Sequence, residues 1–579
     1  MKMKKLFYTS IFALSVFVLA GCDGLLDQKP KDQFTDSNFW TSEQNLKVFA
    51  NSFYGQFSGY GNGGGGGVFY FQTLNDNQVS SGFTEWNYKN VPAAIGLWND
   101  TYANLRKVNI MIERIPLIPM SDEAKNNWLG FARMFRAIYH YELVRAFGDI
   151  IYVDKVLDVN DEDKELYLYG ARQDRDAVMD KVLEDLDFAV SNITMNAGSR
   201  VEVNAAVAQA VKAEICLYEG TFCKYRSTAD GQKAPDATRA NKFLSAAKTA
   251  CEAIMNNDTY KLNDSYQGNY NAIDLAGNTE MILYKRYVYG TLAHSTIDYT
   301  CSSTMQNGMS KAAFDSFLFT DGKPLATTSM DKSDRPVRRA DGVLDISNLL
   351  EVRDPRLSAC VDKELMYKGH GFIRFGAGME STSSTGYGVF KFDNSELETS
   401  HRNNVGSNET DAPIYWLGNI YLNYAEACAE LGSITQADLD KSINKLRDRV
   451  NMPHLTVSPA ADPANNMGVS NIIWEVRRER RVELMYDNND RYWSLIRWHQ
   501  LDKLDVDKYP DQVRGAYVKD DPVAGTADGV TIDAEGYAIV RPAGKERKFE
   551  ARQYLYPVPS GQITLYEAEG KTLSQNYGW

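Results

Sequence analysis

The densest cluster of side chains that could do chemistry lies between residues 475 and 484. Glu475, Glu479 and Glu483 are spaced four residues apart, so they share one face of a predicted helix. Two such carboxylates could serve as the acid and the nucleophile of glycoside hydrolysis. Each glutamate has an arginine three to five positions away, and a nearby cation lowers the pKa of a carboxyl group and removes its proton. The pattern therefore favours a structural ion network over a catalytic pair.

Other catalytic motifs are absent or stand in the wrong context. Residues 59–64 match GxGxxG, but a helical pattern precedes them and an aromatic run follows them, whereas a dinucleotide site needs a strand and then a helix. The serine-hydrolase motif GxSxG does not occur. The six histidines have no metal-ligand spacing, and His140 stands among aromatics on a predicted helix, which is typical of a structural histidine. We predict no catalytic residue, no metal site and no cofactor.

The N-terminus has the pattern of a bacterial export signal. Three lysines precede an apolar run at residues 6–18, and a Leu-Ala-Gly-Cys box ends at Cys22. The run is too short to cross a bilayer, which needs about 20 apolar residues, and Asp23 follows the box directly. We predict a lipoprotein signal peptide at residues 1–21 and a lipid anchor on Cys22.

The composition excludes some classes of protein. The formal net charge is −13, which argues against nucleic-acid binding because that function needs clustered lysine and arginine. The six cysteines after Cys22 show no CxxC spacing, so we interpret them as buried apolar residues. Aromatic residues make up 12% of the chain, and many of them lie in polar surroundings, which indicates a binding surface as well as a core.

Helical periodicity dominates the chain after a tether at residues 22–34, and we treat residues 35–579 as one domain. Apolar stripes at helical spacing predict helices in several regions, namely 121–148, 178–193, 204–222, 243–254, 420–431 and 439–450. Amphipathic helices joined by short links suggest helix pairs of the tetratricopeptide type. Two loop-rich inserts, around residues 258–412 and 506–550, interrupt the pattern, and long irregular segments are usually functional. The predicted fold is mainly α, a scaffold of helix pairs with an irregular ligand-binding region.

The same charged helix resembles the signature of the SusD/RagB family of outer-membrane nutrient-binding lipoproteins. The resemblance rests on ERRVEL at residues 479–484, DRYW at 490–493 and RW at 497–498. Further similar blocks occur in family order: FARMFRA at 131–137, LVRAFGD at 143–149, residues 314–324, VRDPRL at 352–357, YLNYAEA at 421–427, YLYPVP at 554–559 and QNYGW at 575–579. Tyr577 stands where proline is frequent in the family.

The resemblance implies a helical protein with four helix pairs of tetratricopeptide type that support a looped ligand face. It implies a lipid-anchored location on the cell surface at the outer membrane, above a SusC-like TonB-dependent transporter. It also implies binding of an oligosaccharide or polysaccharide, or of a peptide in some members, without enzymatic activity.

Flat aromatic rings cover the apolar face of a sugar, and polar side chains hydrogen-bond to its hydroxyl rim. Two stretches combine these residue types and resemble by position the family's binding face, residues 74–98 and the loops after Met281. We predict ligand contacts by these residues: Trp86, Asp76, Gln78, Asn87, Arg286, Tyr287, Tyr289, Phe372 and Tyr387.

Three rival functions differ from glycan capture in what they require. A peptide-binding member of the same family would differ only in its ligand. A lipid-anchored hydrolase would need paired acids beyond the reach of arginine. A periplasmic solute-binding protein would show alternating strands and helices, whereas this sequence predicts helix after helix.

Overall fold

The computed structural model describes residues 39–157, 167–301, 306–367, 380–488, 490–519, 521 and 530–579. The predicted signal peptide, Cys22, the tether and Phe372 lie outside the described residues. The fold is mainly α, as predicted, with several small sheets.

Ten helices of eight residues or more lie in the described parts of the chain, and their bounds are as follows: α3 (Glu43–Ala50), α4 (Gly96–Arg114), α5 (Asp122–Phe147), α7 (Arg175–Asn192), α8 (Ala205–Tyr225), α9 (Ala237–Met255), α16 (Leu417–Glu430), α19 (Asn471–Glu483), α20 (Asp490–Arg497) and α21 (Ser560–Ala568). Shorter helices are α10 (Gly268–Asn271), α11 (Thr296–Thr300), α12 (Lys311–Phe314), α13 (Ser347–Leu350), α14 (Arg356–Cys360), α15 (Thr399–Arg402), α17 (Gln436–Asp440) and α18 (Ile443–Arg449). Single 3-10 turns are η1 (Asn51–Gln56), η2 (Ile115–Leu117), η3 (Thr228–Asp230), η4 (Leu501–Leu504), η5 (Pro510–Gln512) and η6 (Ala551–Tyr554).

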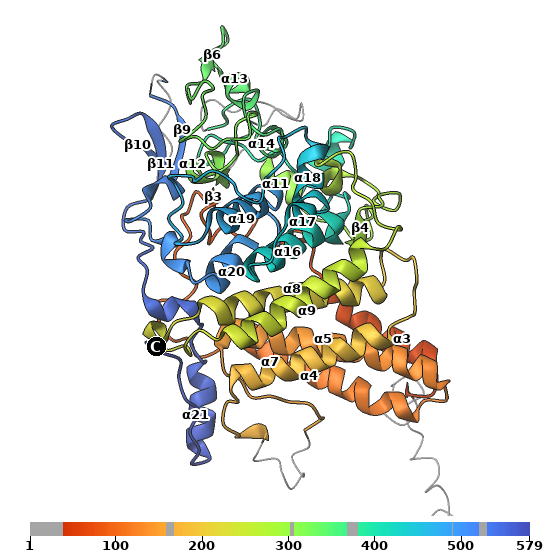
Figure 1. The fold of residues 1–579 in the computed structure, drawn as a ribbon. Helices are drawn as coiled ribbons and strands as arrows, with labels where there is room; N and C mark the ends of the chain where they lie inside the picture. The colour runs from red at the N-terminus through yellow and green to blue at the C-terminus, as the bar shows by residue number, and fades with distance from the viewer. Residues whose placement is uncertain are drawn as a thin grey trace, which may run out of the picture.

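The long helices pack one after another in the order of the chain. Helix α4 contacts α5, α5 contacts α7, α7 contacts α8, α8 contacts α9, and α9 contacts α16. Figure 1 shows α4, α5, α7, α8 and α9 side by side in one half of the molecule, with α16, α19 and α20 above them. This arrangement agrees with the scaffold of paired helices that the periodicity predicts.

Capping side chains fix where these helices begin and end. The Ser121 hydroxyl accepts a hydrogen bond from the backbone N–H of Ala124 at the start of α5, and Gly148 ends that helix with a φ of 73°. The Asn204 side chain accepts from the N–H groups of Ala206 and Val207 at the start of α8. Both helices therefore begin where the sequence predicts.

The predicted helix over residues 439–450 is wrong in one respect. The chain forms α17 and α18, two short helices that are separated at Lys441 and Ser442. The apolar stripe continues because Leu439, Ile443 and Leu446 are all buried in one cluster. Periodicity shows which side chains face the core, but it does not show a break in the backbone.

Helix α16 lies between two hydrophobic cores and contributes side chains to both. Ile420 and Tyr424 pack into the core of the helix bundle, whereas Leu422 and Ala425 pack into the core beneath the loop-rich part. All six described cysteines are buried, as expected for apolar packing. Among the described residues, no helix combines the length and apolarity that a membrane crossing requires.

Between α9 and α16 the described residues form only short elements, which lie at the opposite end of the molecule from α4 (Figure 1). The antiparallel strand pairs are β1 (Gly61–Asn62) with β2 (Gly65–Gly66), β3 (Gln78–Val79) with β5 (Gly308–Met309), β4 (Met281–Lys285) with β8 (Ala412–Trp416), and β6 (Val337–Arg338) with β7 (Leu344–Asp345). The second predicted insert contains a three-stranded sheet in the order β10 (Val530–Ile532), β11 (Tyr537–Val540), β9 (Arg514–Tyr517).

The glycine-rich segment is a tight hairpin formed by β1 and β2, which is not the arrangement of a phosphate-binding loop. Lys285 Nζ donates to the carbonyl oxygen of Ser58 at 3.0 Å, and the Tyr287 hydroxyl donates to that of Gly61 at 2.8 Å. These contacts hold the hairpin against residues 285–287.

Gly61→Ala should destabilise the protein more than Gly63→Ala. Gly61 has a φ of +97°, and an added Cβ would lie 2.2 Å from the Gly65 carbonyl oxygen. Gly63 also has a positive φ, of +56°, but a Cβ there meets nothing within 4 Å. We expect Gly61→Ala to lower the free energy of unfolding by about 3 kcal/mol and Gly63→Ala to lower it by about 1 kcal/mol. Urea unfolding measures both, and equal losses would contradict the packed hairpin.

Candidate functional site

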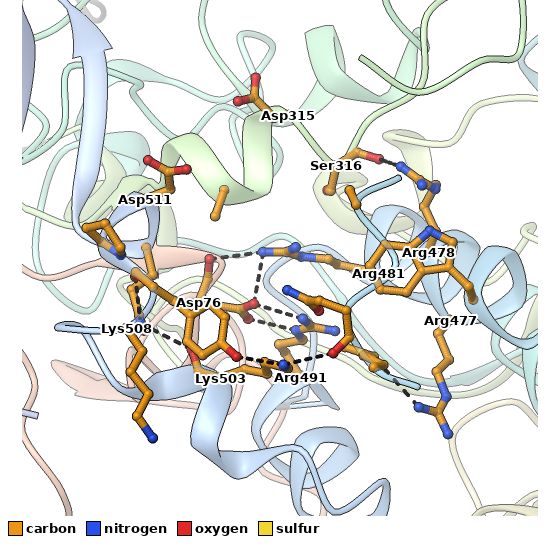
Figure 2. A pocket seen from close by; sticks show the side chains of 18 residues that line it. Asp76, Asp315, Ser316, Arg477, Arg478, Arg481, Arg491, Lys503, Lys508 and Asp511 are labelled. Carbon is orange, nitrogen blue, oxygen red and sulfur yellow. Dashed lines mark hydrogen bonds and ion pairs between the residues drawn. The ribbon is translucent and has the colours of Figure 1, made fainter. Parts of the chain in front are cut away.

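A cavity of about 380 Å³ opens where four distant parts of the chain meet. Its walls come from Asp76, from α12 and the residues after it, from α19 and α20, and from residues 503–512. Figure 2 shows these side chains converging around Asp76. The lining combines the rings of Trp474 and Tyr509 with arginine, lysine and aspartate side chains.

A second hollow of about 490 Å³ lies between residues 267–274 and 390–396. Its described lining has carboxylates and amides but no arginine or lysine, and Phe390 supplies its single aromatic ring. The first cavity offers rings that can cover an apolar face and both donors and acceptors that can bind a polar rim. We therefore take the first cavity as the candidate site.

Asp76 lies at the centre of the candidate site, held by two arginines. Arg491 makes a bidentate contact, from Nε to Oδ1 at 2.7 Å and from Nη2 to Oδ2 at 2.8 Å. Arg481 Nη2 lies 3.2 Å from the same Oδ2 atom. Burial alone would raise the pKa of Asp76, but the two guanidinium groups overcome this effect and hold it well below its usual range. Asp76 is therefore an ionised acceptor.

The backbone around Asp76 has further hydrogen-bond partners besides the arginines. The Asn75 side-chain oxygen accepts hydrogen bonds from the N–H groups of Asn77 and Gln78 at 2.8 and 3.2 Å. The Ser310 hydroxyl donates to the Asp76 carbonyl oxygen at 2.6 Å, next to the pairing of β3 with β5. The carboxylate is thus presented from a rigid turn.

Helix α19 divides its charges between two faces. Arg481 is three residues from Arg478 and four from Arg477, and all three line the cavity. Arg477 Nη2 pairs with Glu430 at 3.0 Å, and Arg478 pairs with Asp462. The arginines reach the cavity because they lie on one face of α19 and the glutamates lie on the other.

The glutamate face of α19 is buried against other arginines. Arg356 Nη1 contacts Glu479 at 2.7 Å and Glu483 at 2.8 Å, and Arg447 Nε contacts Glu479 at 2.8 Å. Burial opposes ionisation of Glu479, but Arg356 and Arg447 prevail and lower its pKa to about 2. The predicted ion network is confirmed at these positions.

Glu475 departs from that prediction. Burial raises its pKa above the usual range, although Arg478 and Arg447 oppose the shift. We expected every glutamate of this helix to have a lowered pKa, and for Glu475 the expectation is wrong because desolvation exceeds the attraction of the arginines. Glu475 does not line the cavity.

The rim of the cavity at residues 503–512 adds cations and a ring. Lys503 Nζ donates to the Tyr509 hydroxyl at 2.7 Å and to the Asn466 carbonyl oxygen at 3.0 Å. Lys508 is exposed. Arg547 ties this rim to the segment before Trp86, since it donates to Gln512 Oε1 at 2.6 Å and to the Thr84 carbonyl oxygen at 3.1 Å.

Four of the predicted contact residues lie on the segment that leads to the cavity. Asp76 lines the cavity, whereas Gln78 is buried in β3 beside it. The Trp86 indole N–H donates to the Lys548 carbonyl oxygen at 2.7 Å, and its ring is half-buried. Asn87 is exposed, and its side-chain N–H donates to the Tyr556 hydroxyl at 2.8 Å. The structure thus places only Asp76 of these four in the cavity wall.

The predicted residues of the second stretch lie elsewhere. Tyr289 is 49% exposed and stacks on the His401 ring, with 3.8 Å between ring centroids. Arg286 is exposed. Tyr287 is buried because its hydroxyl supports the glycine hairpin, and Tyr387 is buried because its ring stacks on Phe314. These two tyrosines therefore present no open ring face, which corrects our expectation for them.

Sequence reasoning missed Trp474, Tyr509 and the arginines as a binding wall. Arg491 both pairs with Asp76 and lines the cavity. The available signal was the separation of charge on α19, with arginines at 477, 478 and 481 and glutamates at 475, 479 and 483.

His140 is the buried structural histidine that was predicted, with Nε2 accepting from the Val153 N–H and a pKa lowered by burial to about 3.

Comparison with known proteins gives consistent results over both halves of the chain. Residues 251–579 match the model of the SusD family, and residues 26–217 match a family described as starch-binding and associating with the outer membrane. A SusD-like protein of Formosa agariphila is 24% identical over 234 residues, which cover 38% of this chain and 43% of that protein. The match spans less than half the length of this relative.

Solved structures match over nearly the whole chain. A SusD-like protein of Bacteroides fragilis is 22% identical with a TM-score of 0.66, covering 95% of this chain and 100% of that structure. A SusD-like carbohydrate-binding protein of the same organism is 20% identical with a TM-score of 0.68, covering 91% and 99%. At such identities the likeness establishes the fold.

Two glutamates on the same face of α19 should affect stability with opposite signs as the pH changes. The folded-state pKa of Glu479 is lowered, so its ionisation contributes stability above pH 4.5, and this stability is lost as the pH falls towards about 2. The difference in unfolding free energy between wild type and Glu479→Gln should shrink by about 1 to 2 kcal/mol from pH 5 to pH 3.

Glu475→Gln is the matched control. The folded-state pKa of Glu475 is raised, so the wild type should lose stability relative to this variant as the pH rises over the same range. Urea unfolding at several pH values measures both slopes. Slopes of the same sign would contradict the opposite pKa shifts of Glu479 and Glu475.

Proposed function

The chain belongs to the SusD family, and on this premise we propose that it binds a glycan at the cell surface and delivers it to a SusC-like TonB-dependent transporter without covalent change. The observation that carries the proposal is the cavity, in which Trp474 and Tyr509 stand beside fixed donors and acceptors. The description of the second matching family as starch-binding, and a structural neighbour described as carbohydrate-binding, support the ligand class.

The cavity has the chemistry that glycan recognition requires. The two rings offer flat apolar surfaces to the C–H face of a sugar. Asp76 offers carboxylate acceptors and Arg481 and Arg491 offer donors to its hydroxyl groups. Because ion pairs hold these groups in place before a ligand arrives, little conformational entropy is lost when they bind.

The predicted lipid anchor on Cys22 would hold the protein at the outer membrane. The second family description, which mentions association with the outer membrane, supports this location. The described residues begin at residue 39, so the anchor is proposed from the sequence pattern alone.

Two rivals make different demands on the same cavity. A hydrolase would need a protonated acid in the cavity, whereas the pKa of Asp76 is held well below its usual range. A peptide-binding role would use the same rings and cations on a different ligand. The predicted residues Trp86, Asn87, Arg286 and Tyr289 remain proposed contacts outside the cavity.

Trp474→Ala should weaken glycan binding by about tenfold or more, as expected for a central aromatic contact. The test uses the chain from Asp23 onward, which retains every described residue, titrated by calorimetry with neutral and acidic oligosaccharides and with peptides. Chromatography of the ligand afterwards tests for cleavage.

Trp86→Ala and Tyr289→Ala test the proposed contacts outside the cavity, since each removes a partly exposed ring there. A larger loss of affinity in either variant than in Trp474→Ala would place the main binding site outside the cavity. Cleaved ligand would contradict a purely binding function. Binding of peptides alone would mean that the ligand is a peptide and not a glycan.

A further inference from the structure

The acidic groups of the cavity are already paired. Six cationic side chains and three carboxylates line it. The carboxylates and their partners are Asp76 with Arg481 and Arg491, Asp315 with Lys311 at 2.7 Å, and Asp511 with Arg514 at 3.2 Å. Lys311 and Arg514 also pair with other acids behind the lining, since Asp334 lies 3.5 Å from Lys311 and Asp533 and Glu535 lie 2.8 and 3.2 Å from Arg514. The surplus of positive charge therefore lies around Asp76 rather than beside the two outer carboxylates.

Positive charge is in excess around Asp76. Arg481, Arg491 and Arg547 all act on this one carboxylate. Arg547 donates only to carbonyl and amide oxygens among the described residues, including Gln512 Oε1. Burial, together with the repulsion of Arg491, lowers the pKa of Arg481 to about 10 despite the attraction of Asp76. Asp76 therefore faces three guanidinium groups, and Asp315, the other carboxylate that acts on Arg481, is itself paired with Lys311.

The lysines at the rim add to the excess of positive charge around Asp76. Lys503 donates to neutral oxygens, and neither Lys503 nor Lys508 has a carboxylate partner within the described chain. Arg477 and Arg478 differ, because Glu430 and Asp462 neutralise them from positions outside the cavity lining. The uncompensated charge is thus confined to the Asp76 side of the cavity and its rim.

The guanidinium groups of Arg481 and Arg491 each have a donor atom that no described residue uses. Arg481 and Arg491 hold Asp76 and its neighbours through Nε and Nη2. No described residue accepts a hydrogen bond from Nη1 of either arginine. Neither Nη1 atom is among the buried polar atoms that lack a partner, so both remain accessible. Because both side chains contact Asp76 Oδ2, their guanidinium groups lie side by side in the cavity wall (Figure 2).

We propose that the cavity selects a glycan that carries oxyanion groups, carboxylate or sulfate, with Arg481 and Arg491 binding the oxyanion and Lys508 attracting it at the rim. The inference rests on the proposed function and names its substrate class. Guanidinium groups bind carboxylate and sulfate oxygens through paired N–H donors. A carboxylate or sulfate group would supply the negative charge that the cavity lacks.

The overall charge does not oppose this selection. The chain has a net charge of −13, but at physiological ionic strength charges are screened beyond about 8 Å. A bound oxyanion therefore responds chiefly to the local cations.

The test compares ligands that differ only in charge. Oligogalacturonate and its fully methyl-esterified form share one backbone, and a sulfated galactan oligosaccharide is compared with its desulfated form. We expect the chain from Asp23 onward to bind at least one charged form about tenfold more tightly than its neutral counterpart, and this preference should fall with added salt. The pair that shows the preference identifies the oxyanion.

Lys508→Glu provides a second arm that leaves the buried ion pairs intact. This exposed charge reversal should weaken binding of the charged ligand by about tenfold while leaving the fold unchanged. Lys107→Glu on α4 is the matched control, since the Lys107 side chain is exposed and, among the described residues, hydrogen-bonds to Asn104 alone.

The outcomes separate the two proposals. Equal binding of charged and neutral glycans, with no effect of Lys508→Glu, would overturn the oxyanion inference and leave glycan capture standing. Binding of no glycan, or of acidic peptides alone, would overturn glycan capture and the inference together.

Discussion

Buried charge governs the architecture around α19. A guanidinium or carboxylate loses its hydration when it is buried, and only a partner at close range restores the lost free energy. Helix α19 carries buried charges on both faces, so the segments around it must supply counter-charges. Glu426 and Glu430 on α16, Arg356 on α14, Arg447 and Arg449 on α18 and Asp76 on the N-terminal segment do so.

This constraint joins the two halves of the molecule. Helix α16 contributes apolar side chains to both cores and acids to the network, so the helix bundle and the loop-rich part share one support. Removing one member of such a pair leaves an uncompensated buried charge and costs about 3 to 5 kcal/mol. The cavity opens where the network meets solvent, and its wall is rigid because the same ion pairs that stabilise the fold also position it.

The helices of the scaffold were predictable from sequence because apolar periodicity and capping residues are local signals. Ser121 and Asn204 begin their helices as predicted, and the break at Ser442 was missed because an apolar stripe continues through it. The ion network of α19 was also foreseen, since glutamates and arginines alternate at helical spacing. The chain also belongs to the family that the sequence resembles.

The site was predictable only in part. Asp76 was identified, but the cavity wall needs α19, the residues after α12 and residues 503–512 to meet in space, and no local pattern encodes that meeting. Tyr287 and Tyr387 looked available because polar residues flank them in sequence. Their burial comes from distant partners, the glycine hairpin and Phe314. Polar neighbours in sequence do not establish exposure.

The most direct test of the account is a crystal structure of the chain with the oligosaccharide that binds it most tightly. We expect a sugar in the cavity, against Trp474 or Tyr509, with a polar group on Arg481 and Arg491. A sugar seated instead on the Tyr289–His401 stack, or in the hollow between residues 267–274 and 390–396, with the cavity left unoccupied, would contradict it.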